Sequence, residues 1–216
     1  MKGILGLLRL SSKDNKPQQQ EQEQEHTDSV FFSTAFANQG VDPTMLVPWE
    51  ARAVEVGAKR LPTSRGGKLL QALWSKDKYM AHLDQDAVKR MERFFEFAHV
   101  PPNRDLIRQD EYGNFMIVLL TGTIAVDRIQ PWGEQLRLAE TRPGDILGEM
   151  SLLDSGIRFS ACTTLTECEI AVLSADAMDD MMGKDPQLAA SLVALLARKL
   201  SLRLRVVSAR LSENQK

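Results

Sequence analysis

One glutamate and one arginine stand nine positions apart in a short segment that is rich in small residues. The segment GDILGEMSLLDSGIRFSA covers residues 144–161, and the two residues are Glu149 and Arg158. Between them Asp154-Ser155-Gly156 is a turn signal. A globular protein can use such a pair to hold a ligand, or it can close a surface salt bridge that contributes less than about 1 kcal/mol.

Composition narrows the classes of protein that can carry this segment. The chain has 216 residues, 43% of them hydrophobic, which is enough for a real core in one domain with extensions or in two small domains. The net charge of −2 does not indicate nucleic acid or acidic lipid as a partner. Neither a metal site nor a Ser/His/Asp group is visible in the sequence, so we expect no metal and no enzymatic activity.

The spacing of the two cysteines gives information about the cellular compartment of the protein but does not indicate a catalytic or metal-binding role. Cys162 and Cys168 are six positions apart, which is neither a CxxC motif nor a zinc-site spacing. We therefore expect both to be small core residues of a protein in the reducing cytoplasm.

The N-terminal residues divide into an apolar start and a polar tether. Residues 1–10, MKGILGLLRL, are too short to span a bilayer and lack a signal-peptide cleavage site. They are either a weak membrane anchor or docking peptide, or a frayed terminus. Residues 11–29 are rich in Gln and Glu, and we expect disorder over residues 1–29.

Two helical segments are expected next. Asp42-Pro43 resembles a helix start, which predicts a helix to about Arg60, although Pro48 can delay it. The LPTSRGG segment, residues 61–67, should break that helix because proline and paired glycines oppose it.

A longer helix is expected over residues 68–98. Apolar residues recur every three or four positions and form one face: Met91, Phe94, Phe95 and Ala98. Asp84 or Asp86 can cap this helix at its start, and Pro101-Pro102 should stop it.

Beyond the prolines the pattern changes to that of short strands. NFMIVLLTGTIAVDRI (residues 114–129), EQLRLAET (134–141) and ACTTLTECEIAVLS (161–174) are β-like, and glycines punctuate the region every nine to twelve residues. This spacing predicts an antiparallel, jelly-roll-like β-roll. With the helices before and after it, the fold class is α+β.

A long helix closes the chain. Asp185-Pro186 is a good start, and neither proline nor glycine follows before about Glu213. Two apolar stripes run along this helix: Leu188, Leu195, Leu202 and Ala209 in one, and Val193, Leu200 and Val207 in the other, backed by Ala197, Leu204 and Leu211. One stripe should pack on the roll, and the other either meets a partner helix in a homodimer or is buried within one subunit.

In this order of elements the chain resembles the cyclic nucleotide-binding domain family, such as the effector domain of catabolite activator proteins. The resemblance rests on GNFMIVLLTGTIAV, on RPGDILGEMSLLDSGIRFSACTTLTECEIAVLS and on the helix after Asp185-Pro186, and covers roughly residues 73–210. We therefore expect a cyclic nucleotide-binding domain with its C-terminal helix (71–216), preceded by the polar tail (1–29) and by a helical extension or linker (30–70) that the resemblance does not cover.

The resemblance also implies a binding site for cAMP or cGMP, or for a cyclic dinucleotide. In that family a short helix, here about Glu149 to Leu153, points its first N–H groups at the cyclic phosphate. Arg158 matches the arginine that pairs with the phosphate, Glu149 matches the glutamate that accepts from the ribose hydroxyl, and Gly148 lets backbone approach the sugar. The implied contacts extend along the same segment and to the last helix: Leu147, Met150, Ser151, Phe159, Ser160 and Arg203.

The sequence leaves more than one role open for two of these residues, Phe159 and Arg203. Phe159 stands where the family usually has Ser or Thr, and Ser160 points to the opposite face of a regular strand. Phe159 can stack on a base, block the pocket or face the core. Arg203 either meets the base or is a solvated helix arginine.

Two functions therefore remain open from the sequence. The first is a non-enzymatic cyclic-nucleotide sensor that moves its last helix. The second is a degenerate fold that acts as a ligand-independent interaction scaffold. Because Lys216 follows directly after the last helix, we expect no helix-turn-helix, no sequence-specific DNA binding, and a protein partner at the N-terminal third.

Overall fold

The structure, a computed structural model, describes residues 30–78, 80 and 83–213. The predicted tail of residues 1–29, with its apolar start, lies outside the described residues. Within the described part, none of the helices combines the length and the apolar character that crossing a membrane requires.

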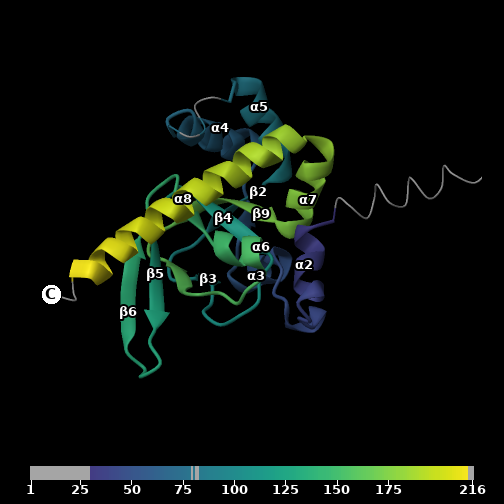
Figure 1. The fold of residues 1–216 in the computed structure, drawn as a ribbon. Coiled ribbons are helices and arrows are strands. Elements are labelled where there is room, and N and C mark those ends of the chain that lie inside the picture. Colours follow the sequence, from purple (N-terminus) through teal and green to yellow (C-terminus); the bar gives the residue numbers. More distant parts are fainter. Residues whose placement is uncertain (1–29, 79, 81–82, 214–216) are drawn as a thin grey trace, which may run out of the picture.

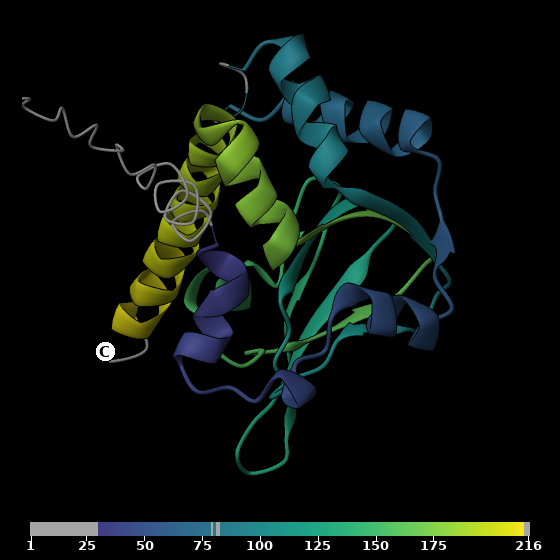
Figure 2. The same cartoon turned by 90° about the vertical axis from the view of Figure 1, so that its right-hand side faces the viewer.

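Two antiparallel sheets form the β-roll, which confirms the predicted α+β class (Figures 1 and 2). The first sheet has the order β1-β2-β9-β4-β7 and the second β3-β8-β5-β6. The strands are β1 Lys59–Arg60, β2 Glu96–Val100, β3 Asp105–Ile107, β4 Phe115–Thr121, β5 Ile124–Ile129, β6 Gln135–Glu140, β7 Ile146–Leu147, β8 Ala161–Thr164 and β9 Cys168–Ser174.

Strand β4 shows how the sheets and helices share the core. Ile117 and Leu119 point into the roll, where they join a cluster with Ile124 of the second sheet. Met116 and Val118 point the other way, into a second cluster formed with the helices. Because both faces of β4 are covered, its sequence is continuously apolar rather than alternating.

The first predicted helix is wrong as a continuous element. Asp42 caps only a short 3-10 turn, η1 (Pro43–Met45), by accepting a hydrogen bond from the Thr44 amide at 2.9 Å. Pro48 then precedes α3 (Trp49–Glu55), so the predicted delay at this proline is confirmed. Proline keeps the residue before it out of the helical region, and this splits the helix.

The expected break at the paired glycines is also wrong. Gly66 and Gly67 lie inside α4 (Thr63–Trp74). A Cβ at Gly66 would stand 2.2 Å from Phe97 Cδ1, and one at Gly67 would stand 2.1 Å from Glu92 Oε2. The glycines therefore let α4 pack closely on its neighbours.

The continuous helix expected over residues 68–98 is wrong, because α4 ends at Trp74 and the next helix begins only at Gln85. The cap at Asp84 is confirmed, because its carboxylate accepts from the Ala87 amide at 2.6 Å, but α5 (Gln85–Met91) and the turn η2 (Glu92–Phe94) end before Phe95. Ala98 lies in β2, which pairs with β9 over its whole length. The hydrogen-bond ladder of the sheet overrides the helical spacing of the apolar residues.

The N-terminal helices pack against the rest of the fold. Helix α2 (Phe32–Asn38) begins at the buried carboxylate of Asp179, which accepts from the Phe32 and Ser33 amides at 2.8 Å each. At the other end of α2, the Gln39 side chain donates to the Asp154 carbonyl at 2.9 Å. Helix α2 is therefore attached to Asp179 at its start and to Asp154 at its end, and Figure 2 shows it beside the helix that contains Asp179.

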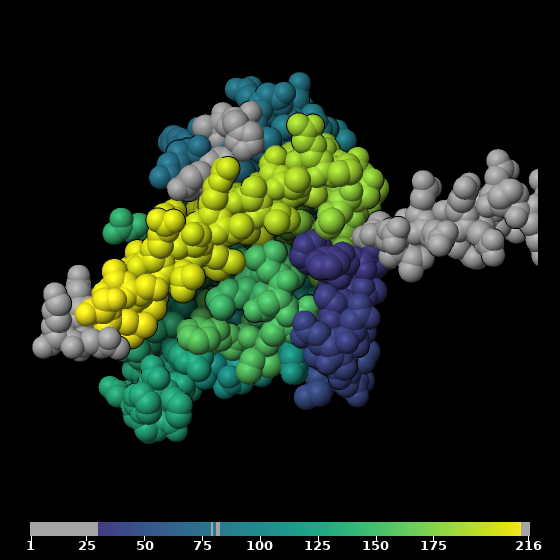
Figure 3. All heavy atoms as spheres, viewed as in Figure 1, coloured from purple at the N-terminus to yellow at the C-terminus, as the bar shows by residue number. Residues whose placement is uncertain are grey.

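Two helices follow the roll. Ser174 caps α7 (Ala175–Lys184), a helix that the sequence analysis missed, and α8 covers Pro186–Glu213 as predicted. The Asp185 carboxylate accepts from the Leu188 amide at 3.3 Å, which confirms the predicted start of α8. Figure 3 shows α8 as a ridge that runs across the face of the roll.

Candidate functional site

The candidate site begins at a sharp turn between β7 and a short helix. Gly148 has a φ of +75°, and α6 (Glu149–Asp154) starts directly after it, close to the predicted range. A Cβ at Gly148 would stand 2.6 Å from Arg158 Nη1 and 2.9 Å from Ile107 Cδ1. Both the backbone angle and the close approach of Arg158 require glycine here.

Arg158 is turned into the protein and is only 3% exposed. Its guanidinium donates to the Gly148 carbonyl at 2.8 Å and to the Phe115 carbonyl at 2.7 Å, and its central carbon lies 4.7 Å from the centre of the Phe115 ring. Among the residues that the structure describes, no carboxylate forms an ion pair with it. Burial lowers the pKa of Arg158 to about 10, so the group stays charged at neutral pH.

Glu149 is the second buried charge and is 4% exposed. Arg203 of α8 forms an ion pair with its carboxylate and donates a further hydrogen bond to the Ile146 carbonyl at 2.8 Å. Burial raises the pKa of Glu149, and the charge of Arg203 opposes this rise. The structure thus brings together Glu149 and Arg203, whereas the alternative of a surface salt bridge between Glu149 and Arg158 is wrong.

The remaining predicted contacts divide between the interior and the surface. Leu147 and Ser151 are buried, Ser160 is partly buried, and Met150 is exposed. Phe159 is 50% exposed and lies against Arg128, whose guanidinium carbon is 4.0 Å from the centre of the ring. The alternative that Phe159 faces the core is therefore wrong.

Sequence reasoning missed the residues that surround Arg158. Phe115 lies under its guanidinium, and the backbone of Glu111 accepts from the Arg158 amide at 2.8 Å. Arg52 forms an ion pair with Glu111, and the Trp49 ring meets the Phe115 ring edge to face at 5.7 Å. Only the fold brings these residues together, because α3 is separated from Arg158 by about half of the chain.

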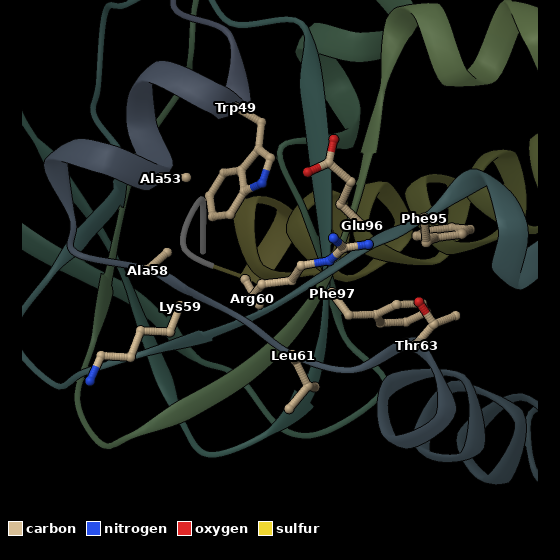
Figure 4. Close-up of a pocket in the computed structure, with 11 residues that line it drawn as sticks. Trp49, Ala53, Ala58, Lys59, Arg60, Leu61, Thr63, Phe95, Glu96 and Phe97 are labelled. Carbon is tan, nitrogen blue, oxygen red and sulfur yellow. The ribbon is translucent and has the colours of Figure 1, made fainter.

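Two cavities lie near the residues that surround Arg158 in the described part of the chain. One of about 330 Å³ lies between α3, β1 and β2, with Trp49, Glu96 and Arg60 on its walls (Figure 4). The other, of about 530 Å³, is lined by Arg108 and by Arg128, which packs on Phe159. Neither is lined by a residue that the sequence assigned to the ligand.

The structure thus has the features that the resemblance to the cyclic nucleotide-binding domain family implied: a β-roll, a short helix after Gly148, a buried arginine and a long C-terminal helix. Residues 97–185 match the family model of the cyclic nucleotide-binding domain. This match is to part of the chain, and it agrees with the family that the sequence motifs indicated.

Curated relatives include bacterial regulators. The CRP-like cAMP-activated global transcriptional regulator of Mycobacterium tuberculosis is 25% identical over 118 residues, covering 55% of this chain and 53% of the relative. The cyclic AMP receptor protein of Thermus thermophilus is 29% identical over 107 residues, covering 50% of each. The chain thus spans about half the length of the curated relatives it matches.

Solved structures support the same fold. A cyclic nucleotide-binding domain from Methylobacillus flagellatus aligns with a TM-score of 0.66 at 23% identity, covering 71% of this chain and 86% of that one. The Thermus thermophilus catabolite activator protein aligns with a TM-score of 0.53 at 27% identity, covering 61% and 63%. The family model and the solved structures therefore agree on the fold of a cyclic nucleotide-binding domain.

Proposed function

We propose that this protein is a non-enzymatic sensor that binds a cyclic nucleotide, cAMP or cGMP, between α6, Arg158 and α8. The observation that carries the proposal is the buried guanidinium of Arg158, which has two neutral carbonyl partners and no carboxylate partner among the described residues. A buried charge is costly without a counter-ion, and a cyclic phosphate would supply one.

The second buried charge couples this site to α8. Glu149 would accept a hydrogen bond from the ribose hydroxyl, but its carboxylate is paired with Arg203. A bound nucleotide would compete with Arg203 for this carboxylate, and α8 would change its position if the ligand binds one position more tightly than the other. Arg203 would then contact the base, as the resemblance implies, or turn to solvent.

Calorimetry with cAMP, cGMP and cyclic dinucleotides tests the proposal. Arg158→Gln should weaken binding of the best ligand about tenfold or more, because a charge-assisted hydrogen bond to a buried group contributes about 1.5–3 kcal/mol. Arg90→Gln, which removes the surface partner of Asp185, is the matched control and should bind as the wild type does. An unchanged dissociation constant in a folded Arg158→Gln protein would remove Arg158 as the phosphate contact.

The second candidate is a ligand-independent scaffold. It is favoured by Phe159 at the usual Ser/Thr position and by Arg203 on the carboxylate of Glu149. Phe159→Ser separates the remaining roles of this ring: binding should strengthen if Phe159 blocks the pocket and weaken if it stacks on the ligand. Absence of binding in both the wild type and Phe159→Ser would favour the scaffold.

We also propose that the protein forms a homodimer through α8. The second half of this helix exposes apolar side chains on several of its faces: Leu202, Leu204, Val206, Val207 and Leu211. Such a helix is usually covered by a partner. Light scattering of the full chain should show a dimer that Val207→Glu dissociates, and a strict monomer at high micromolar concentration would contradict the dimer.

The proposal also includes the surface through which the protein would signal to a partner and the cellular compartment in which it would act. A protein partner would bind the N-terminal third, where Val54 and Met45 are exposed. We also expect no sequence-specific DNA binding. Val54→Asp should weaken capture of that partner by the full chain, and a protected site in DNA footprinting at physiological salt would contradict the second expectation. The cysteines Cys162 and Cys168 are free and buried, which supports the cytoplasm as the compartment.

A further inference from the structure

The loop of residues 110–115 is the immediate neighbour of Arg158. The Arg158 amide donates to the Glu111 carbonyl at 2.8 Å, and the Asp110 amide donates to the Arg158 carbonyl at 2.9 Å. The guanidinium donates to the Phe115 carbonyl at the other end of the loop. Any displacement of this loop therefore displaces Arg158.

Helix α3 and the residues before it hold this loop in place. The Val47 amide donates to the Tyr112 carbonyl at 2.9 Å, and the Trp49 ring packs on the Phe115 ring. Figure 4 shows the indole of Trp49 at the wall of the neighbouring cavity. Val47 and Trp49 precede position 97, so they lie outside the part of the chain that matches the family model, whereas the loop that they hold lies inside it.

Four charged residues form a closed group between α3 and the loop, which we call the α3 cluster: Arg52, Glu55, Arg108 and Glu111. Arg52 is 1% exposed and forms ion pairs with both glutamates. Arg108 pairs with Glu55 and approaches the other oxygen of Glu111 at 3.7 Å. The two positive and two negative charges balance, so the Glu111 carboxylate is neutralised within the cluster.

We propose that Arg52 is a positioning residue for Arg158: by holding the Glu111 carboxylate in the α3 cluster, it leaves the Arg158 guanidinium available to an external anion. This inference rests on the proposed function, since the anion is the phosphate of a cyclic nucleotide. It assigns a role in ligand binding to a residue of the N-terminal extension.

The physical reason is competition between an internal and an external counter-ion. The backbone hydrogen bond to Arg158 keeps Glu111 beside it, and the negative charge of Glu111 already favours the charged form of Arg158. Without Arg52, the two glutamates of the α3 cluster would share Arg108 alone, so Glu111 would keep an excess of negative charge close to a buried cation. An ion pair between Glu111 and Arg158 would then have to break before a phosphate could bind.

Calorimetry on the full chain with cAMP and cGMP tests this competition. Arg52→Gln should weaken binding about tenfold, a typical size for coupling between sites. Glu111→Gln should not weaken it, and the double variant Arg52→Gln/Glu111→Gln should recover wild-type affinity. Arg65→Gln, which removes the partner of the buried Glu169, is the matched control and should leave affinity unchanged.

A merely structural role predicts a different pattern. If the ion pair only fixes the loop, Glu111→Gln would weaken binding as much as Arg52→Gln, and the double variant would not recover. That result, or unchanged affinity in Arg52→Gln, would overturn the proposal. Arg52→Lys keeps the charge and should bind nearly as the wild type does, which provides the comparison if Arg52→Gln is poorly folded by circular dichroism.

A measurement without nucleotide separates this inference from the proposed function. The side-chain ¹⁵N signal of Arg158, assigned by its loss in Arg158→Lys, should shift in Arg52→Gln and return in the double variant. If the wild type binds neither nucleotide but this shift and its return occur, the proposed function fails while the effect of Arg52 on Arg158 stands. If the Arg158 signal has the same position in Arg52→Gln as in the wild type, then Arg52 has no effect on Arg158 and the inference is wrong.

Discussion

Both halves of α8 carry apolar side chains along the helix, but their surroundings differ. In the first half, apolar side chains at helical spacing are buried against the fold: Leu188, Leu192, Leu195 and Leu196. In the second half, residues 201–212 are all exposed, although they continue the same apolar pattern. The comparison teaches that the spacing of apolar residues predicts where a helix forms, but it does not predict which part of the protein packs against that helix.

Arg203 marks the change between the two halves. It lies in the exposed half, yet its guanidinium reaches back to Glu149 and to the Ile146 carbonyl. The first half of the helix is held by apolar packing as far as Leu196, whereas residues 204–212, which follow Arg203, are all exposed. This polar contact therefore holds the second half of the helix beside the candidate site.

The largest expected effect is a difference in stability between substitutions in the two halves of α8. Leu196→Ala should lower the free energy of unfolding by about 2–5 kcal/mol, because Leu196 is 0% exposed and its removal leaves a cavity. Leu204→Ala is the control at 67% exposure and should change it by less than about 0.5 kcal/mol at a concentration where the protein is monomeric. Urea denaturation measures both, and equal losses would show that the second half is also buried.

A smaller effect is expected at the contact that joins the halves. Arg203→Gln should lower the free energy of unfolding by about 1–3 kcal/mol, because it removes the ion-pair partner of the buried Glu149 carboxylate. The effect should be local: amide hydrogen exchange should speed up over residues 201–212 and stay unchanged over residues 188–196. Exchange that stays unchanged over both ranges would show that Arg203 does not hold the helix end.

The smallest effect concerns pH. Burial raises the pKa of Glu149 above its ordinary value of 4.5, so between 4.5 and the raised value the folded protein keeps a proton that the unfolded chain has lost. The contribution of Glu149 to stability is therefore fully present below 4.5 and decreases as pH rises through the raised pKa. Glu149→Gln cannot titrate, so the wild type should lose stability relative to this variant as pH rises. Denaturation curves at several pH values measure the difference, and a constant difference would contradict the shift.

Much of the fold could be predicted from local patterns. The strand β9, the start of α8 at Asp185 and the cap at Asp84 each depend on residues close together in the chain. The helix expected to reach Ala98 failed because strand pairing with β9 decided that segment. The break expected at Gly66 and Gly67 failed because close packing on Phe97 and Glu92, not the propensity of glycine, explains these residues.

For the candidate site, the sequence by itself determined where the sharp turn, the short helix and the two charged residues lie along the chain. The order Gly148, Glu149 and Arg158 identifies the short helix and its two charges, because the turn and the helix start are local events. It also determined the length of α8, since neither proline nor glycine interrupts the helix after Pro186.

Only the tertiary structure decided which partners these charges have. Glu149 meets Arg203 across 54 positions of the chain, and Arg158 meets the carbonyl of Phe115 across 43. The partner of a buried charge depends on which elements pack over it, and such packing joins residues without any regular spacing in sequence. For the same physical reason Arg52, in a helix outside the matched domain, could be linked to Arg158 only when the fold placed Glu111 between them.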